Sequence, residues 1–180
     1  FDEAETVEVL QASPDRVTPR CPHFGTCGGC VLQHLAEDQQ IVIKQQVLID
    51  NLQRIGHVTP ETVLPPLTDA AWGYRRKGRL SVRRVEKKGK TLVGFRENDG
   101  RYVADLSRCE TVIPEIGGKI DALCALIDGM DARSDIPQIE FIAGDRTPEY
   151  SGIALVFRHL APLSDSDRTA LTAFAQAHDF

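Results

Sequence analysis

Three cysteines, Cys21, Cys27 and Cys30, stand within ten residues in the segment CPHFGTCGGC. Gly28 and Gly29 separate the last two, and glycine permits the tight turn that points neighbouring thiols the same way. The backbone N–H groups of these glycines are also able to donate hydrogen bonds to sulfur. Because thiolates are soft, strongly donating ligands, the segment predicts a loop shaped by a shared inorganic centre rather than by an apolar core.

A fourth ligand has to come from elsewhere in the chain. There are five cysteines, and an odd number with three crowded together is a poor disulfide framework. No secretory signal is visible, and clustered cysteines in a reducing cytosol more often bind metal or do redox chemistry. Cys109, in polar LSRCETV after a predicted strand, is the better candidate. Cys124, in IDALCALID, occupies an apolar helical position typical of a small buried side chain.

The spacing of the cysteines bears on which metal they bind. The pattern is C-x5-C-x2-C followed by one distant cysteine, whereas zinc fingers and ribbons usually carry two close pairs. An iron–sulfur cubane spreads its irons and takes thiolates from several directions. The pattern therefore favours a 4Fe–4S cluster held by Cys21, Cys27, Cys30 and Cys109. Zinc and the absence of any metal are the alternatives.

Hydrophobic periodicity organises the first part of the chain. Residues 4–10 alternate apolar and polar side chains, which predicts a strand. Between residues 33 and 55 apolar side chains recur at helical spacings and predict a long helix. Gly56 follows, where a left-handed C-terminal cap is expected. The proline-rich segment 59–73 predicts a connection.

The second part of the chain changes to a period of two. RLSVRRV places Leu80 and Val82 on one face of a strand and Arg79, Ser81 and Arg83 on the other. This and the short turns between strands predict an α+β fold with an antiparallel sheet, a cluster loop with four cysteine ligands and a long flanking helix. Further strands are predicted at 91–97, 101–107, 138–144 and 152–160, with a hairpin turn at 98–100, and helices at 114–128 and 165–178, the latter capped by Ser164 or Asp165.

The segment YRRKGRLSVRRVEKKGK carries nine basic residues against one acid, Glu86, in a chain of net charge −5. A solvated strand face is the plain alternative, although such a face usually mixes both signs of charge. Arginine binds phosphate bidentately, and nearby aromatic rings offer stacking planes. The segment therefore predicts contact with nucleic acid, through Arg75, Arg76, Lys77, Arg79, Arg83 and Arg84.

Both ends of the chain suggest a fragment of a longer protein. The chain opens at Phe1 with a strand pattern already in progress, and the helix predicted at 165–178 has no Gly or Pro stop signal. No apolar run approaches the roughly 20 residues that a membrane span needs. We therefore expect a cytoplasmic protein without a membrane partner.

Five segments, in this order, carry a resemblance: SPDRVTPRCPHFGTCGGCVLQHL, YRRKGRLSVRR, VGFRE, DLSRC and VFRHLAPLS. Together they resemble the bacterial RNA 5-methyluridine methyltransferases, and among these the 23S rRNA (uracil-C5)-methyltransferases that carry an iron–sulfur cluster. The resemblance runs over essentially all 180 residues. Its most specific part is the three-cysteine motif with a distant fourth cysteine.

The resemblance implies a domain plan. The family has an N-terminal oligonucleotide-binding barrel, a central domain with a 4Fe–4S cluster, and a C-terminal domain that binds S-adenosylmethionine. Residues 1–20 would then end the barrel and its linker, 21–163 would form the central domain, and 164–180 would lead to the methyltransferase domain. The helix at 33–55 would pack on that catalytic domain. By motif, the cluster ligands would be Cys21, Cys27, Cys30 and Cys109.

The resemblance also implies a reaction for the parent enzyme. Such enzymes flip a uracil out of its RNA, add a cysteine to C6, and methylate C5 from S-adenosylmethionine. No catalytic residue and no S-adenosylmethionine-binding residue is matched here, so the segment alone is expected to be inactive. The expected partner is RNA, most specifically 23S rRNA, with no obligate protein partner implied. The alternatives are an iron–sulfur electron-transfer or redox protein and a zinc-stapled RNA-binding module without catalysis.

Overall fold

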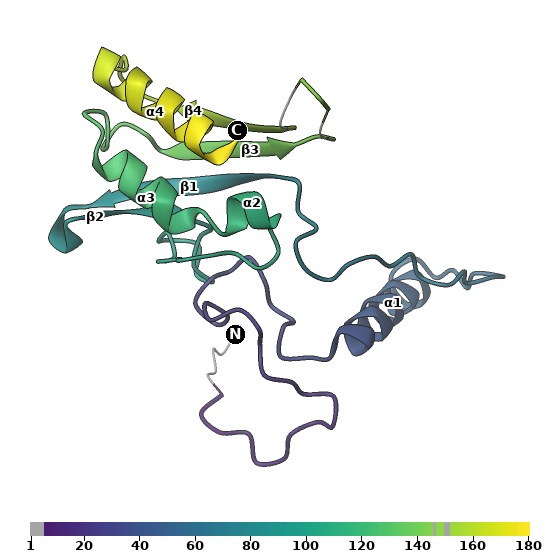
Figure 1. The fold of residues 1–180 in the computed structure, drawn as a ribbon. Coiled ribbons are helices and arrows are strands. Elements are labelled where there is room, and N and C mark those ends of the chain that lie inside the picture. The colour runs from purple at the N-terminus through teal and green to yellow at the C-terminus, as the bar shows by residue number, and fades with distance from the viewer. Residues whose placement is uncertain (1–5, 146, 150–151) are drawn as a thin grey trace. The chain divides into compact units, whose positions relative to one another are not determined.

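The computed structural model describes residues 6–145, 147–149 and 152–180 (Figure 1). The chain divides into two compact units. The first joins the residues before Cys21 to Val31–Asp69, and the second joins Cys21–Cys30 to Ala70–Phe180. The cysteine loop thus packs with the later part of the chain rather than with its immediate neighbours in sequence.

Helix α1, Glu37–Arg54, is the regular element of the first unit among the residues described. It lies within the range predicted for the long helix, and that helix is confirmed. Glu37 and Asp38 in its first turn and Arg54 in its last suit the helix dipole. None of its residues is buried.

The end of α1 differs from the prediction. The residue with a left-handed backbone is His57, at φ 50°, and not Gly56. Gly56 instead donates its N–H to Asn51 O at 3.0 Å, and a Cβ on it would stand 2.9 Å from Leu52 O. Glycine is therefore required here for close backbone approach rather than for a positive φ.

The second unit is built on a four-stranded antiparallel sheet of order β2-β1-β3-β4. Together with the helices this confirms the predicted α+β class. A 3-10 turn, Glu86–Lys88, followed by Gly89 at φ 63°, joins the first two strands. The strands are β1 Lys77–Val85, β2 Lys90–Gly94, β3 Gln138–Ala143 and β4 Ile153–Arg158.

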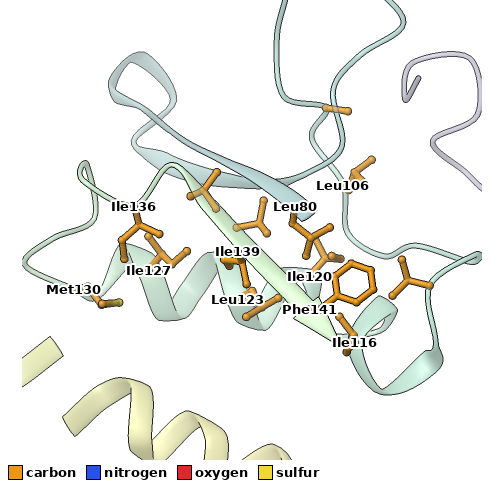
Figure 2. Close-up of a cluster of buried hydrophobic side chains, with 14 residues drawn as sticks. Leu80, Leu106, Ile116, Ile120, Leu123, Ile127, Met130, Ile136, Ile139 and Phe141 are labelled. Carbon is orange, nitrogen blue, oxygen red and sulfur yellow. The ribbon is translucent and has the colours of Figure 1, made fainter. Parts of the chain in front are cut away.

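The core lies between one face of this sheet and the helices. Leu80 on β1 and Ile139 and Phe141 on β3 are fully buried. They pack with Ile120 and Leu123 of α3, Ile120–Asp128 (Figure 2). The predicted alternation of β1 is confirmed, because Leu80 and Val82 are buried while Arg79 and Arg83 are exposed.

The helix predicted at 114–128 is broken into α2, Pro114–Gly117, and α3. The break serves the backbone of Cys109, whose N–H donates to Gly117 O at 2.9 Å. A Cβ at position 117 would stand 2.3 Å from Cys109 O. Only glycine permits this approach, so the prediction of one continuous helix was wrong for a tertiary reason.

Two predicted strands do not form. Of the strand at 4–10, residues 4 and 5 lie outside the described residues, and 6–10 are irregular, since none of the strands described pairs with them. The segment 101–107 makes only a single bridge, Arg96 with Val103, before it turns away. The predicted hairpin turn at 98–100 is present, with Gly100 at φ 73° donating to Glu97 O.

Helix α4, Asp165–His178, agrees with its predicted range, and Ser164 is its N-cap. The Ser164 hydroxyl accepts from the Asp167 N–H at 3.1 Å. Asp167 is buried and also accepts from the Asp131 N–H at 2.8 Å. The cap therefore ties α4 to the segment that follows α3, and both helices cover the same face of the sheet (Figure 1).

Candidate metal centre and nucleic-acid interface

The loop Cys21–Cys30 is held on the turn that follows β2. Gly28 N–H donates to Arg96 O at 2.9 Å, and Asn98 N–H donates to Thr26 O at 3.1 Å. The Asn98 side chain donates to Gly25 O. A Cβ on Gly28 would stand 3.0 Å from Glu97 O, so this glycine allows the two backbones to meet.

His23 forms a second anchor for the loop. Its Nε2 accepts from the backbone N–H of Ser107 at 3.1 Å and lies 3.1 Å from the Ser107 hydroxyl. The bond joins positions 84 residues apart and brings the loop to the segment that contains Cys109.

Cys109 itself is fixed by its neighbours. Its backbone N–H bonds Gly117 O, and its Sγ lies 3.4 Å from the Thr111 hydroxyl. Gly29 N–H donates to Cys27 Sγ at 3.4 Å, the N–H···S interaction that the glycines predicted. Such donors stabilise a thiolate and tune any metal bound to it.

The thiols of the loop and Cys109 are within electrostatic reach of one another. Burial raises the pKa of Cys21 and Cys27, and negative charge on Cys109 and on Cys30 raises the pKa of both further. Within the part of the chain that the structure describes, no group of three or more His, Cys, Asp or Glu side chains converges closely enough to hold a metal ion. The set of four cysteine ligands therefore stays a prediction. Two observations fit it: all four residues carry thiols, and all four belong to the second compact unit.

Cys124 is separate from this group. It lies on α3, packed against the core. Burial raises its pKa to about 11. The side chain is half-buried rather than fully buried, so the predicted role as a small buried side chain is met in part.

The four predicted RNA-binding residues on β1 fall into two sets. Lys77, Arg79 and Arg83 lie on the exposed face of β1. Arg84 points to the core side, is 16% exposed, and donates to Asp128 Oδ1 at 2.7 Å. Its position gives Arg84 a role in holding β1 to α3, in contrast to the three residues on the other face.

Arg75 and Arg76 lie just before β1 and are both engaged. Arg76 donates to Ala143 O at 3.2 Å, to Gly144 O, and to Asp145 Oδ1 at 2.9 Å. The Arg75 guanidinium lies 5.3 Å from the centroid of the Phe95 ring, a cation–π distance. The Phe95 ring would lie 3.6 Å from a Cβ on Gly29. Arg75 is thus linked through one ring to the cysteine loop.

Acids that are distant in sequence moderate the basic segment. Glu140 lies 4.0 Å from Lys77 and 3.8 Å from Arg79. Asp105 lies 2.7 Å from Lys90. A count of charges within the segment finds only Glu86, because the other acids reach the segment through sheet pairing and the turn after β2.

Among the described residues, no helix has the length and apolar character needed to cross a membrane.

Comparison with known proteins finds relatives that match the whole chain. No family model matches it. It is 72% identical over all 180 residues to the 23S rRNA (uracil(1939)-C(5))-methyltransferase RlmD of Xanthomonas campestris pv. campestris (strain 8004). It is 69% identical to the protein of that name from Stenotrophomonas maltophilia (strain K279a) and 68% identical to that from Xanthomonas oryzae pv. oryzae (strain KACC10331 / KXO85), again over 180 residues.

The chain spans 39% of the length of each of these relatives. The matched range includes the cysteine loop, the basic segment and the sheet, since it extends over the entire chain. The predicted resemblance is confirmed, because the chain is similar in sequence over its whole length to a part of the 23S rRNA (uracil-C5)-methyltransferases.

Proposed function

We propose that this chain is the cluster-binding and RNA-contacting part of an rRNA (uracil-C5)-methyltransferase that uses S-adenosylmethionine. The observation that carries the proposal is that three loop cysteines and Cys109 belong to one compact unit with the basic strand β1. The names of the relatives support the reaction class. The reaction itself belongs to the whole enzyme, and the chain alone is expected to transfer no methyl group.

The residues of the chain have distinct parts in this proposal. Cys21, Cys27, Cys30 and Cys109 would hold a 4Fe–4S cluster. When bound, the cluster would supply a covalent cross-link between the loop and the segment after β2. His23 and Gly28 dock the loop on the same segment without it. Metal ligation of this kind can contribute on the order of 10 kcal/mol to folding.

The RNA contact follows from the exposed face of β1. Lys77, Arg79 and Arg83 present their charges on one side of the sheet, where Arg forks can bind phosphate bidentately. Arg75 extends this surface toward the cysteine loop, whereas Arg76 extends it toward the segment after β3. Arg84 is also one of the predicted RNA-binding residues. Because its guanidinium bonds Asp128, we expect it to contribute least to RNA binding.

Metal analysis after purification without oxygen tests the centre. We expect about four irons per chain and broad absorbance near 400 nm, and the variant Cys109→Ser should lose both. Cys124→Ser is the matched control and should keep its iron. One zinc per chain would instead favour the zinc-stapled module, and a cluster that cycles with a protein partner in a chain without RNA affinity would favour the redox alternative.

Titration with single-stranded RNA tests the contact. Each phosphate contact should add about −0.7 to the slope of log affinity against log salt. Arg79→Ala and Arg83→Ala should each flatten the slope by about this amount. A slope near zero for the unmodified chain would overturn RNA binding by β1.

A further inference from the structure

The face of the sheet opposite α3 and α4 is a surface of three strands rather than one. Pairing aligns Ser81 with Gln138, and Gln138 with Arg158. Paired residues share a face of the sheet, so all three side chains lie on the exposed side of β1. The alternation of β4 agrees, because Ile153, Leu155 and Phe157 pack on the core while Ala154, Val156 and Arg158 are exposed.

The same face is closed at β2. Gly94 pairs with Ser81, and a Cβ on it would stand 2.6 Å from Leu106 Cδ1. Leu92, on the same side of β2, is only 6% exposed. The open part therefore spans β1, β3 and β4, where Ile142 and Val156 remain 39% and 53% exposed.

The open face is positively charged in an acidic chain. The strand register places four cations and one acid on this face. The cations are Lys77, Arg79, Arg83 and Arg158, and the acid is Glu140. Among the described residues, neither Arg83 nor Arg158 has an ion-pair partner. This charge is complementary to a phosphate backbone.

Glu140 is the residue that limits this charge. It stands between Lys77 and Arg79, at 4.0 and 3.8 Å, and both cations are more than two-thirds exposed. Exposed pairs at such distances are weak, typically below about 1 kcal/mol. An incoming phosphate is therefore able to replace Glu140 as the partner of either cation. The nearby carboxylate of Glu140 would repel that phosphate and weaken its binding.

We infer that this open face, and not β1 alone, binds a single-stranded segment of RNA, with Arg158 and Gln138 as contacts and Glu140 as a residue that lowers the affinity. The inference rests on the proposed function. Arg158 and Arg83 would bind phosphates, and the Gln138 amide and Ser81 hydroxyl would bond sugars or base edges. Short polar and apolar side chains such as Ser81 and Val156 reach bases only where these are unstacked and splayed, which single strands permit and duplexes do not.

Fluorescence anisotropy with the 180-residue chain, purified without oxygen, tests this. The probe is a labelled single-stranded RNA of about 12 nucleotides, within the usual site range. Arg158→Ala should weaken binding by about five- to tenfold and flatten the salt slope by about 0.7. Glu140→Gln should strengthen binding by about threefold. Arg168→Ala, an exposed arginine on α4 and therefore on the helix side, is the charge-matched control and should change affinity less than about twofold.

The outcomes separate this inference from the proposed function. If Arg158→Ala behaves like Arg168→Ala while Arg79→Ala weakens binding, the three-strand face is wrong and RNA contact by β1 stands. If Arg79→Ala is also without effect, both fail. The last comparison uses a duplex of the same sequence. If Arg158→Ala weakens binding to the duplex as much as it weakens binding to the single strand, the assignment to single strands is wrong. Because Arg79, Arg158 and Arg168 are exposed and Glu140 is only half-buried, unchanged thermal unfolding should accompany each variant.

Discussion

Helix α1 and strand β3 show how differently the two units use their apolar residues. On β3, Ile139 and Phe141 are fully buried. On α1, Val47 and Leu48 are 53% and 57% exposed, and no residue is buried. A helix held mostly by packing needs a buried face. The sheet unit therefore has an apolar core of its own, and the described residues of the first unit do not form one. Stability should therefore be concentrated in the second unit.

The largest expected difference comes from truncating one large apolar side chain in each unit. Phe141→Ala should lower the free energy of unfolding by about 3–5 kcal/mol. Leu48→Ala on α1 should lower it by less than about 1 kcal/mol. Denaturant titration followed by circular dichroism measures both. If the two variants cost the same, the apolar side of α1 is covered in solution and the contrast between the units fails.

The contact between Cys109 and α2 should be the next most sensitive. In Gly117→Ala the new Cβ would stand 2.3 Å from Cys109 O, so the backbone must move, at a cost of about 2 kcal/mol. Iron content should fall as well, because Cys109 would be displaced. Gly129→Ala, whose Cβ would lie 3.5 Å from Leu126 O, is the control. Equal stability and iron in both variants would show that α2 does not position Cys109.

Helix caps give a smaller contrast between the units. Ser164→Ala removes the bond to the Asp167 N–H and should cost about 1 kcal/mol. The N-cap of α1 is Ala36, which has no side-chain cap bond. Ala36→Ser should raise helicity while adding only a few tenths of a kcal/mol to global stability. Far-UV circular dichroism and thermal unfolding measure the pair, and a gain from Ala36→Ser as large as the loss from Ser164→Ala would mean that the two helices are equally coupled to the core.

An effect as small as that of the Ser164 cap is a loss of stability at high pH that comes from Cys124. Its pKa is raised from an ordinary 9.0 to about 11 by burial on α3, so the folded state holds the thiol proton more tightly than the unfolded state. The contribution is complete below pH 9.0 and disappears as the pH rises toward about 11. Because the thiol is partly exposed, we expect about 1 kcal/mol. Urea titrations across this range should show the extra decline in the unmodified chain but not in Cys124→Ala, and parallel curves would contradict the burial of this thiol.

Sequence alone predicted the parts that follow from local patterns. The alternation of Leu80 and Val82 with arginines, and the Ser164 cap, are readable because period and capping chemistry are local. The break between α2 and α3 was not, since it depends on a backbone contact between Cys109 and Gly117. In Gly56 the right residue was chosen for the wrong reason.

The candidate site divides in the same way. Spacing singled out the three loop cysteines, and position singled out Cys109. The tether from His23 to Ser107 and the acid Glu140 beside the arginines were not foreseen, because each depends on residues brought together by the fold. The side of the sheet on which Arg158 lies could be predicted in part. The alternation along its strand puts Arg158 and Phe157 on opposite faces, but the order of the strands in the sheet was missing.

The docking of the cysteine loop has a consequence for synthesis. Its anchors, Asn98, Ser107 and the Cys109–Gly117 contact, all come much later in the chain. At about 5–20 residues per second, the ribosome releases Gly117 on the order of ten seconds after Cys30. During that interval three neighbouring thiols have emerged with nothing to dock against, so the nascent chain passes through a stage at which oxidation or capture of the wrong ion competes with correct assembly.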